Sequence, residues 1–280
     1  MREINTSVIT QVVKELCITA NCKLPDDVKN ALDLAVENEE SELGKNIINT
    51  IINNYKIGEK ESLAICQDTG IVIVFCEIGQ DVHLIGESIE ESINDGVRQA
   101  YKEGYFRNSI IGDPLIRNNT GDNTPAIIYY EIVQGEKIKV TVVPKGFGSE
   151  NMSALKMLKP SEGIEGVIKF VLETVENAGA NPCPPIVVGM GIGGTMDKAA
   201  LLAKKALMRP VDSENKNEHI AKLEKLMFDL INGLGIGPQG LGGRITALSV
   251  NIETYPTHIA GLPVAINIGC HVNRHASREL

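Results

Sequence analysis

Residues 181–195 read NPCPPIVVGMGIGGT. The run PIVVG is short and apolar, which predicts a buried β-strand between the prolines before it and the glycines after it. The next segment, MDKAALLAKKALM at 196–208, predicts a helix because its apolar residues recur at three- and four-residue spacing. A strand that leads through a glycine-rich turn into a helix indicates a chain that mixes α and β structure.

The glycines of this stretch also permit a nucleotide-binding interpretation. Gly189, Gly191 and Gly194 fit the pattern G-x-G-x-x-G between a strand and a helix, which is the context of a dinucleotide-binding fingerprint. That fingerprint needs a second strand ending in an acidic residue about 20 residues further on. Asp212 and Glu214 lie in that region, but no apolar strand precedes them. An NAD-binding dehydrogenase is therefore the weaker alternative, and the same glycines could present backbone N–H groups to another anion.

On either side of this stretch the chain contains helical and strand-like segments. IVIVFCEIG at 71–79 predicts a strand, and AIIYYEIV at 126–133 with KIKVTVVP at 137–144 predicts a β-hairpin. We expect a mixed α and β (α+β) fold, a single domain over residues 1–280 whose helical N-terminal part, residues 1–60, packs on a β-sheet domain. Further helices are predicted at 87–104, 162–179 and 217–233, and a further strand at 245–256, before the segment THIAGLPVAINIGC at 257–270.

The composition and charge limit the classes of function. The chain has 280 residues, of which 43% are hydrophobic and 22% charged, and this excludes a disordered or fibrous protein. Its formal net charge is −9 and it has no tryptophan, which disfavours a nucleic-acid binder. An anionic ligand would need a few local Arg or Lys side chains, because the overall field repels it.

No segment predicts insertion into a membrane or passage through one. No apolar run approaches the ~18–20 residues that span a bilayer. The N-terminal segment MREINTSVITQVVKEL has neither a basic region nor a continuous apolar stretch, so it does not resemble a secretory signal. We therefore expect a cytoplasmic protein, in which thiols stay reduced.

Three of the six cysteines share a setting that the others lack. Cys66, Cys183 and Cys270 each lie on a turn rich in Gly, Pro or polar residues, beside an apolar strand. Their separations do not suit a structural zinc site, which usually shows close C-x(2–4)-C pairs. Three thiolates suit an iron–sulfur cluster in which one iron has no protein ligand and acts as a Lewis acid. Unrelated structural thiols are the other interpretation, and the one we favour for Cys17, Cys22 and Cys76.

Six segments of the chain together resemble one known family. They are ICQDTG at 65–70, KGFGSEN at 145–151, NPCPPIVVGMGIGGT at 181–195, GLGIGPQGLGG at 233–243, THIAGLPVAIN at 257–267 and GCHVNRHASREL at 269–280. In this order they resemble the class I (iron–sulfur) fumarate hydratases, and more closely the alpha subunit of the two-subunit form. L-tartrate dehydratase alpha subunits share these motifs. The resemblance implies a hydro-lyase that reversibly hydrates fumarate to (S)-malate, or one that dehydrates L-tartrate to oxaloacetate.

The resemblance also implies a cofactor, a partner and a set of site residues. A [4Fe-4S] cluster would be held by Cys66, Cys183 and Cys270, and its fourth iron would bind the hydroxyl and one carboxylate of the substrate. A beta subunit would supply the remaining active-site residues in an α2β2 assembly, and no nucleic-acid or membrane partner is expected. Five further positions match the family's site, catalytic Asp68, Gln67 and His258 and substrate-binding Arg107 and Gly148.

These site residues also have ordinary structural interpretations. Asp68 is the best acid or base in the chain, but it could instead cap the turn that follows it. Arg107 suits a carboxylate because its guanidinium can bind both oxygens, although Arg117 is a rival for that role. His258 could be an ordinary loop histidine. His271 and His275 could orient a cluster or lie in a solvated tail. A non-catalytic iron–sulfur protein, with a fourth cluster ligand and no response to substrate, is the alternative from another class of function.

Overall fold

The computed structural model describes residues 2–280, so Met1 lies outside the described residues, and it confirms the mixed α and β fold class. Contacts within the chain divide it into two compact units. Unit 1 holds the N-terminal segment up to Pro25 together with Asn54–Phe147 and Arg274–Leu280. Unit 2 holds Asp26–Asn53 and Gly148–Asn273. That residues 1–280 act as one functional domain stays a prediction.

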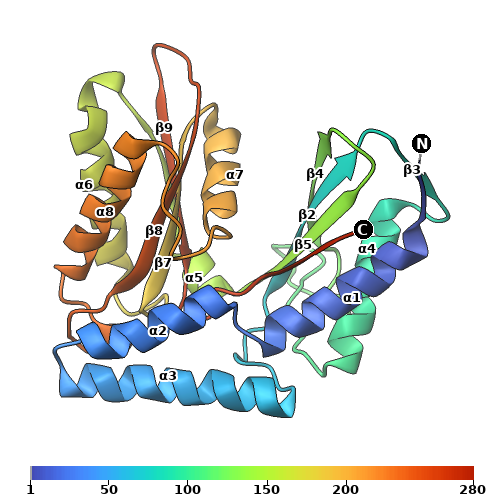
Figure 1. The fold of residues 1–280 in the computed structure, drawn as a ribbon, viewed down its shortest axis with the longest axis horizontal. Coiled ribbons are helices and arrows are strands. Elements are labelled where there is room, and N and C mark those ends of the chain that lie inside the picture. Colours follow the sequence, from blue (N-terminus) through green and yellow to red (C-terminus); the bar gives the residue numbers. More distant parts are fainter. Residues whose placement is uncertain (1) are drawn as a thin grey trace. The chain divides into compact units, whose positions relative to one another are not determined.

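Unit 1 is built on a four-stranded sheet in the order β10-β5-β2-β4. β2 (Ile71–Gly79) lies inside this sheet, and most of its side chains are buried. α1 (Thr6–Cys22) and α4 (Ile89–Glu103) pack against each other and bury apolar side chains with those of the sheet (Figure 1). The other strands of unit 1 are β5 (Ile138–Lys145), β4 (Ile127–Val133), β10 (Ala276–Glu279) and the parallel pair of β1 (Arg2–Asn5) and β3 (Val82–Ile85).

The predicted hairpin of β4 and β5 is wrong. β2 lies between the two strands, parallel to β4 and antiparallel to β5. Their short connection crosses the end of β2, where the N–H of Gly79 donates to the carbonyl of Lys137 at 2.8 Å. Burial explains this order, because β2 is apolar on both faces whereas β4 has exposed and half-buried side chains that suit an edge. The C-terminal segment, for which a solvated tail was one interpretation, adds β10 to the other side of β5.

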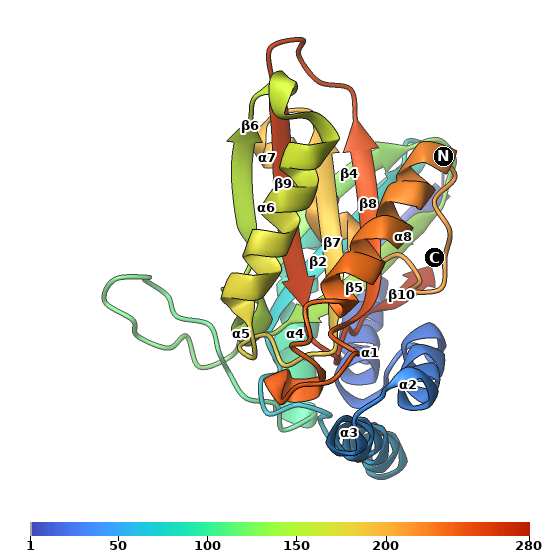
Figure 2. The ribbon, with the colours of Figure 1, turned by 90° about the vertical axis from the view of Figure 1, so that its left-hand side faces the viewer.

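Unit 2 is built on a second four-stranded sheet, in the order β6-β9-β7-β8. β7 (Ile186–Gly193) is parallel to β8 (Ala247–Tyr255) and antiparallel to β9 (Leu262–Gly269). α7 covers one face of this sheet, and α6 and α8 cover the other (Figure 2). These helices are α6 (Gly163–Ala178), α7 (Met196–Ala206) and α8 (Glu218–Asn232); the smaller elements are β6 (Ala154–Leu158), α5 (Phe147–Glu150) and the 3-10 turns η1 (Pro160–Glu162) and η2 (Pro238–Gly240).

The helices predicted in the N-terminal part are confirmed as α1, α2 (Asp26–Asn38) and α3 (Glu42–Glu61). The side chain of Asn5 caps α1 by accepting a backbone N–H at 3.0 Å. Asp26 and Asp27 lie in the first turn of α2, where the helix dipole favours negative charge. α3 contributes residues to both units. No helix within residues 2–280 is long and apolar enough to cross a membrane.

The glycine motif serves helix packing. Gly189 and Gly191 lie inside β7, and α7 packs directly on them. A Cβ at Gly191 would come within 2.0 Å of the carbonyl oxygen of Ala199, and one at Gly189 within 2.4 Å of that of Ala203. Only glycine permits so close an approach of helix to strand. The dinucleotide alternative is therefore not supported, because two of its three glycines belong to the strand and not to a phosphate-binding turn.

Candidate active site

The turn that carries Cys66 is fixed by side chains of unit 1. This turn, residues 65–70, precedes β2 and is called the Cys66 turn. Asn54 donates to the carbonyl of Ile65 at 2.8 Å, and the hydroxyl of Tyr101 donates to that of Thr69 at 2.6 Å. Cys66 is half-buried and Gln67 is exposed. Two carbonyl groups of the turn are thus satisfied inside the unit, which fixes the backbone that carries these two side chains.

Asp68 is oriented by two backbone amides. Its Oδ1 accepts from the N–H of Gly70 at 3.0 Å, and its Oδ2 accepts from the N–H of Phe147 at 2.8 Å. A Cβ at Gly146 would lie 3.1 Å from Oδ2, so a larger residue there would crowd the carboxylate. The turn-capping interpretation therefore describes a contact that exists. It is compatible with acid–base chemistry, because the same two amides hold the half-buried carboxylate in place.

The loop that carries Arg107 is anchored to the Cys66 turn. The hydroxyl of Thr69 donates to the carbonyl of Arg107 at 2.8 Å. The buried Asn123 accepts from the N–H of Ser109 at 2.7 Å and donates to the carbonyl of Gly70 at 3.2 Å. The side chain of Arg107 itself is exposed. Unit 1 therefore brings together, on neighbouring backbone segments, four of the predicted site residues, Cys66, Gln67, Asp68 and Arg107.

Arg117 is less well placed than Arg107. It lies on the exposed part of the same long loop, and its guanidinium donates to the carbonyl of Pro114 at 3.5 Å. None of the hydrogen bonds found within residues 2–280 joins it to the Cys66 turn. The backbone of Arg107, unlike that of Arg117, is thus hydrogen-bonded to the Cys66 turn, and which arginine binds substrate stays a prediction.

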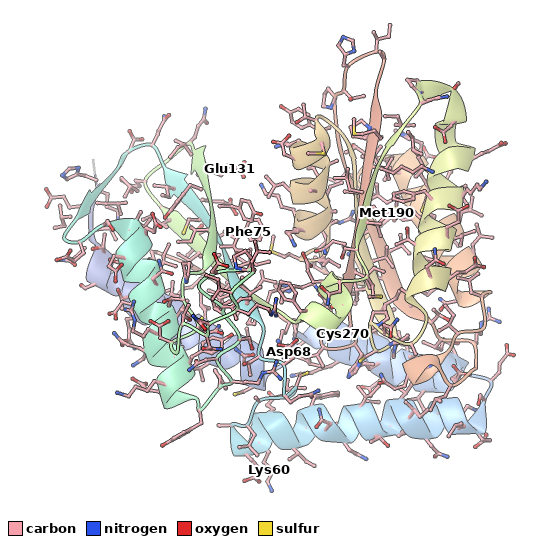
Figure 3. The ribbon with its side chains drawn as sticks, turned by 180° about the vertical axis from the view of Figure 1, so that it is seen from behind. Lys60, Asp68, Phe75, Glu131, Met190 and Cys270 are labelled. Atoms are coloured by element: carbon pink, nitrogen blue, oxygen red, sulfur yellow. The ribbon has the colours of Figure 1, made fainter. Side chains whose placement is uncertain are left out.

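Cys183 and Cys270 lie at the same edge of the unit 2 sheet. Cys183 precedes β7 and Cys270 follows β9, and the antiparallel register pairs Val187 with Gly269 at this edge. Figure 3 shows Cys270 at this end of the strands, with Met190 further along β7. Nδ1 of His271 lies 2.9 Å from the carbonyl oxygen of Cys183, so the two cysteine loops are in direct contact. We call this side of the sheet the cysteine edge.

Gln239 is a residue of the cysteine edge that the sequence analysis missed. Its N–H and its side-chain amide both donate to the carbonyl of Pro184, at 2.8 and 2.7 Å, and the amide also lies 3.3 Å from Nδ1 of His271. Gln239 has a φ of +53° and Cys183 one of +56°. Non-glycine residues adopt this region rarely, and it persists where surrounding contacts impose it. A single polar residue between glycines, at 237–240, was the available signal.

The loop behind Gln239 is held by a buried carboxylate. Glu39, 2% exposed, accepts the N–H groups of Arg244 and Ile245 at 2.9 and 2.8 Å. It also accepts those of the two residues that follow it, Glu40 and Ser41. Burial alone would raise the pKa of Glu39, but the four backbone donors outweigh it and hold the pKa below its usual value. Glu39 therefore connects the end of α2 to the loop that ends in Gly243.

Gly148 lies beside the Cys183 loop. It belongs to α5, and a Cβ placed on it would lie 3.6 Å from the carbonyl oxygen of Asn181, which is an ordinary contact. A side chain larger than that of glycine would therefore fit at position 148. The expectation that its N–H contacts substrate stays a prediction.

His258 lies at the opposite edge of the same sheet. The loop 256–261, called here the distal loop, follows β8 where Gly193 pairs with Tyr255. β7 spans 8 residues, or about 25 Å at ~3.3 Å per residue. The imidazole of His258 is exposed and accepts from the N–H of Ala260 at 3.2 Å. Unit 2 thus does not bring His258 to its own cysteine edge.

The other cysteines differ from the three loop cysteines in burial. Cys17, Cys22 and Cys76 are buried in apolar surroundings, and burial raises the pKa of each thiol, that of Cys76 to about 12. A buried, protonated thiol is a poor metal ligand. Cys66 and Cys270 are half-buried and Cys183 is exposed, and no disulfide is formed within residues 2–280. This chemistry fits three thiolate ligands for a cluster, although no three His, Cys, Asp or Glu side chains in that part of the chain are gathered around one metal position.

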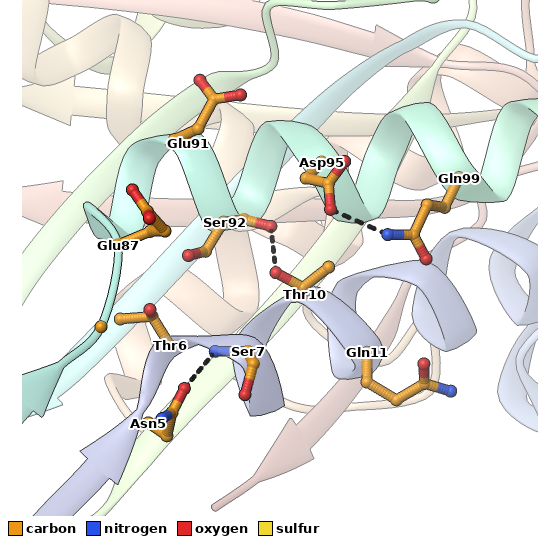
Figure 4. A pocket seen from close by; sticks show the side chains of 11 residues that line it. Asn5, Thr6, Ser7, Thr10, Gln11, Glu87, Glu91, Ser92, Asp95 and Gln99 are labelled. Carbon is orange, nitrogen blue, oxygen red and sulfur yellow. Dashed lines mark hydrogen bonds between the residues drawn. The ribbon is translucent and has the colours of Figure 1, made fainter.

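A pocket in unit 1 offers a contrasting environment. It lies where α1 and α4 begin and is lined by hydroxyl, amide and carboxylate side chains (Figure 4). Glu87, Glu91 and Asp95 are its charged lining residues. A lining without a cation is unsuited to a dicarboxylate. The cysteine turns, and not this pocket, are therefore the candidate site.

Comparison with known proteins identifies the family of the chain. Residues 10–279 match the family model described as fumarate hydratase (Fumerase), whose members are hydro-lyases. The chain is 50% identical to the "Putative L(+)-tartrate dehydratase subunit alpha" of Methanocaldococcus jannaschii over 97% of both chains. It is 32% identical to the L(+)-tartrate dehydratase subunit alpha of Escherichia coli (strain K12), over 96% of this chain and 89% of that relative. The enzyme class is that of a hydro-lyase. Within it, the chain belongs to the fumarate hydratase and tartrate dehydratase alpha-subunit family.

Proposed function

We propose that the chain is the cluster-bearing alpha subunit of an iron–sulfur hydro-lyase that interconverts fumarate and (S)-malate. Dehydration of L-tartrate to oxaloacetate is the second candidate, and it fits the names of the relatives equally well. The observation that carries the proposal is the setting of the cysteines. Cys66, Cys183 and Cys270 lie on turns fixed by hydrogen bonds, whereas the other three are buried in apolar cores.

These three cysteines would hold a [4Fe-4S] cluster, which when bound supplies a Lewis-acidic iron for the substrate's hydroxyl group. The protein's own part begins with binding. The Arg107 side chain is exposed next to the Cys66 turn and can bind one carboxylate of a diacid through both of its oxygens. Gln67, exposed on the same turn, can donate its amide N–H to the substrate.

Asp68 acts as the general acid or base in this proposal. Hydration of an alkene diacid requires a proton at the carbon next to the one that receives oxygen, and dehydration requires its removal. The Asp68 carboxylate can carry that proton because amide donors from Gly70 and Phe147 fix its orientation without occupying all of its lone pairs. We do not assign His258 to this chain's own site, since it lies at the far edge of the unit 2 sheet.

A partner subunit completes this proposal. The relatives are named as alpha subunits, and we propose that a beta subunit supplies the remaining substrate-binding groups in an α2β2 assembly. The net charge of −9 makes additional local cations necessary for binding a dianion.

An anaerobic assay of the α–β pair with fumarate, (S)-malate and L-tartrate side by side tests the function. We expect activity that depends on added iron and sulfide and that is lost when the cluster is extracted. Turnover by cluster-free protein would contradict the proposal. Preference for tartrate would select the second candidate, and absence of turnover with all three acids in an iron-loaded pair would refute both.

A further inference from the structure

Arg274 is a buried arginine in the C-terminal segment, four residues after Cys270 in the sequence. It is 3% exposed and belongs to unit 1. Its Nη2 donates to the carbonyl of Asp68, in the Cys66 turn, and its Nε donates to the carbonyl of Pro144 at 3.4 Å. Its Nη1 is buried and has no acceptor among residues 2–280. One donor of a permanently charged group is thus left without a partner.

The guanidinium of Arg274 also forms no ion pair with a carboxylate among residues 2–280. Arg209, the comparable arginine of unit 2, is mostly buried and pairs with Glu224 at 2.7 Å. No such ion pair is found for Arg274 in the described part of the chain. Taking a guanidinium out of water without an opposite charge is unfavourable, because carbonyl dipoles offset only part of the lost hydration. Residues 2–280 therefore bury a cation that none of their carboxylates is paired with.

An anionic group at the Cys66 turn would supply the missing charge. Arg274 donates to the carbonyl of Asp68, two residues after Cys66, so its charge is in hydrogen-bond contact with the turn that carries this thiol. A cysteine thiolate bound to an iron–sulfur cluster is anionic. Resting on the proposed function, we propose that Arg274 is a positioning residue whose positive charge balances the thiolate-bound cluster at the Cys66 turn.

A purely structural role makes a different prediction. If Arg274 only joins the carbonyls of Asp68 and Pro144, any side chain that donates to Asp68 should suffice. Arg274→Lys keeps a donor and the charge, and Arg274→Gln keeps a donor and removes the charge. Arg278→Gln is the matched control, because Arg278 lies in the same segment but is exposed and pairs with Glu15.

The measurement is the rate at which a chelator removes iron from the anaerobically reconstituted α–β complex, together with the EPR spectrum of the cluster and the melting temperature of the iron-free form. We expect Arg274→Gln to lose iron about tenfold faster than the parent protein, and Arg274→Lys and Arg278→Gln to stay within about threefold. Without iron the order should not follow the charge in this way: Arg274→Gln should melt no lower than Arg274→Lys, because it no longer buries a charge that lacks an opposite one. Equal rates of iron loss from Arg274→Lys and Arg274→Gln would overturn the inference.

A second variant keeps the test decisive if Arg274→Gln does not fold. Arg274→Ala removes the whole side chain, and added guanidinium can occupy the space with its charge, whereas urea has a similar shape and no charge. We expect guanidinium to slow iron loss from Arg274→Ala, and urea at the same millimolar concentration to have no such effect. Equal effects would count against the charge role. A parent complex that takes up no iron and sulfide would refute the proposed function itself. A parent complex that holds a cluster, with variants that all lose iron at the same rate, would refute only the role of Arg274.

Discussion

The two edges of the unit 2 sheet are built differently. At the cysteine edge, Cys183, His271 and Gln239 are connected by contacts to backbone carbonyls, and two residues there adopt a positive φ. At the other edge the distal loop is exposed, with Ile259 91% accessible. One sheet thus combines a fixed edge and an exposed one. The contrast teaches that the fixed edge can hold ligands at defined positions. The distal loop is hydrogen-bonded to Gly194 at its start, through Pro256 and Thr257, and its tip is exposed.

Removing a cysteine of the fixed edge is the strongest test of this contrast. We expect Cys183→Ala or Cys270→Ala to abolish cluster binding and reduce turnover at least a hundredfold, because a [4Fe-4S] cluster with only two protein ligands is poorly held. Iron and sulfide content and the anaerobic hydratase assay measure this. Cys17→Ala is the control, since that thiol is completely buried in unit 1. Full cluster content in Cys183→Ala would remove the cysteine edge from the site.

Unit 1 carries a turn that is fixed in a similar way, and Asp68 tests whether it is catalytic. Asp68→Asn should lower kcat by about a hundredfold or more while the cluster spectrum is retained, as expected for loss of a general acid or base. Asp197→Asn is a suitable control because that carboxylate is exposed and contacts Thr195. Unchanged kcat in Asp68→Asn would leave Asp68 with only its role in holding the turn.

Glu39 tests what keeps the fixed edge in place. Replacement by Gln leaves at least one buried backbone N–H without an acceptor, which we expect to cost about 1–3 kcal/mol of unfolding free energy in urea. The pKa of Glu39 is lowered in the folded protein, so its contribution is complete above the unfolded pKa and is lost as the pH falls below about 4.5. The difference between parent and Glu39→Gln should therefore shrink in acid. A difference that does not change with pH would contradict this account.

Much of the fold follows from local patterns in the sequence. The helices at 87–104 and 162–179 and the strand at 71–79 are confirmed, because apolar spacing and glycine ends specify them locally. The position of β2 between β4 and β5 was not predictable in this way. This strand order depends on which strand gains most from the centre of the sheet, and that is a property of the whole unit.

The candidate site shows a similar division. The cysteines on punctuated turns could be selected from the sequence, and two of them meet at one edge. Gln239, Glu39 and Arg274 could not, because each acts through backbone carbonyls or amides of residues far away in the sequence. His258 could be selected from the family motif, but its position at the opposite edge of the sheet from the two cysteines could not, and its catalytic role stays a prediction. Side chains that position a site are recognised only once the backbone they hold is known.

The smallest change in the rate of iron loss is expected for a pair of variants that compares the cysteine edge with the distal loop. Gln239→Ala removes the amide that donates to Pro184 and lies beside His271, so the Cys183 loop should hold iron less firmly and lose it a few-fold faster to a chelator. His258→Ala should leave that rate unchanged, because the distal loop lies a full strand length away in the same unit. Both rates are measured on anaerobically reconstituted protein. If His258→Ala released iron as fast as Gln239→Ala, the distal loop would have to contact a bound cluster. That cluster could not be held at the cysteine edge of the same unit, because the two edges are a full strand apart.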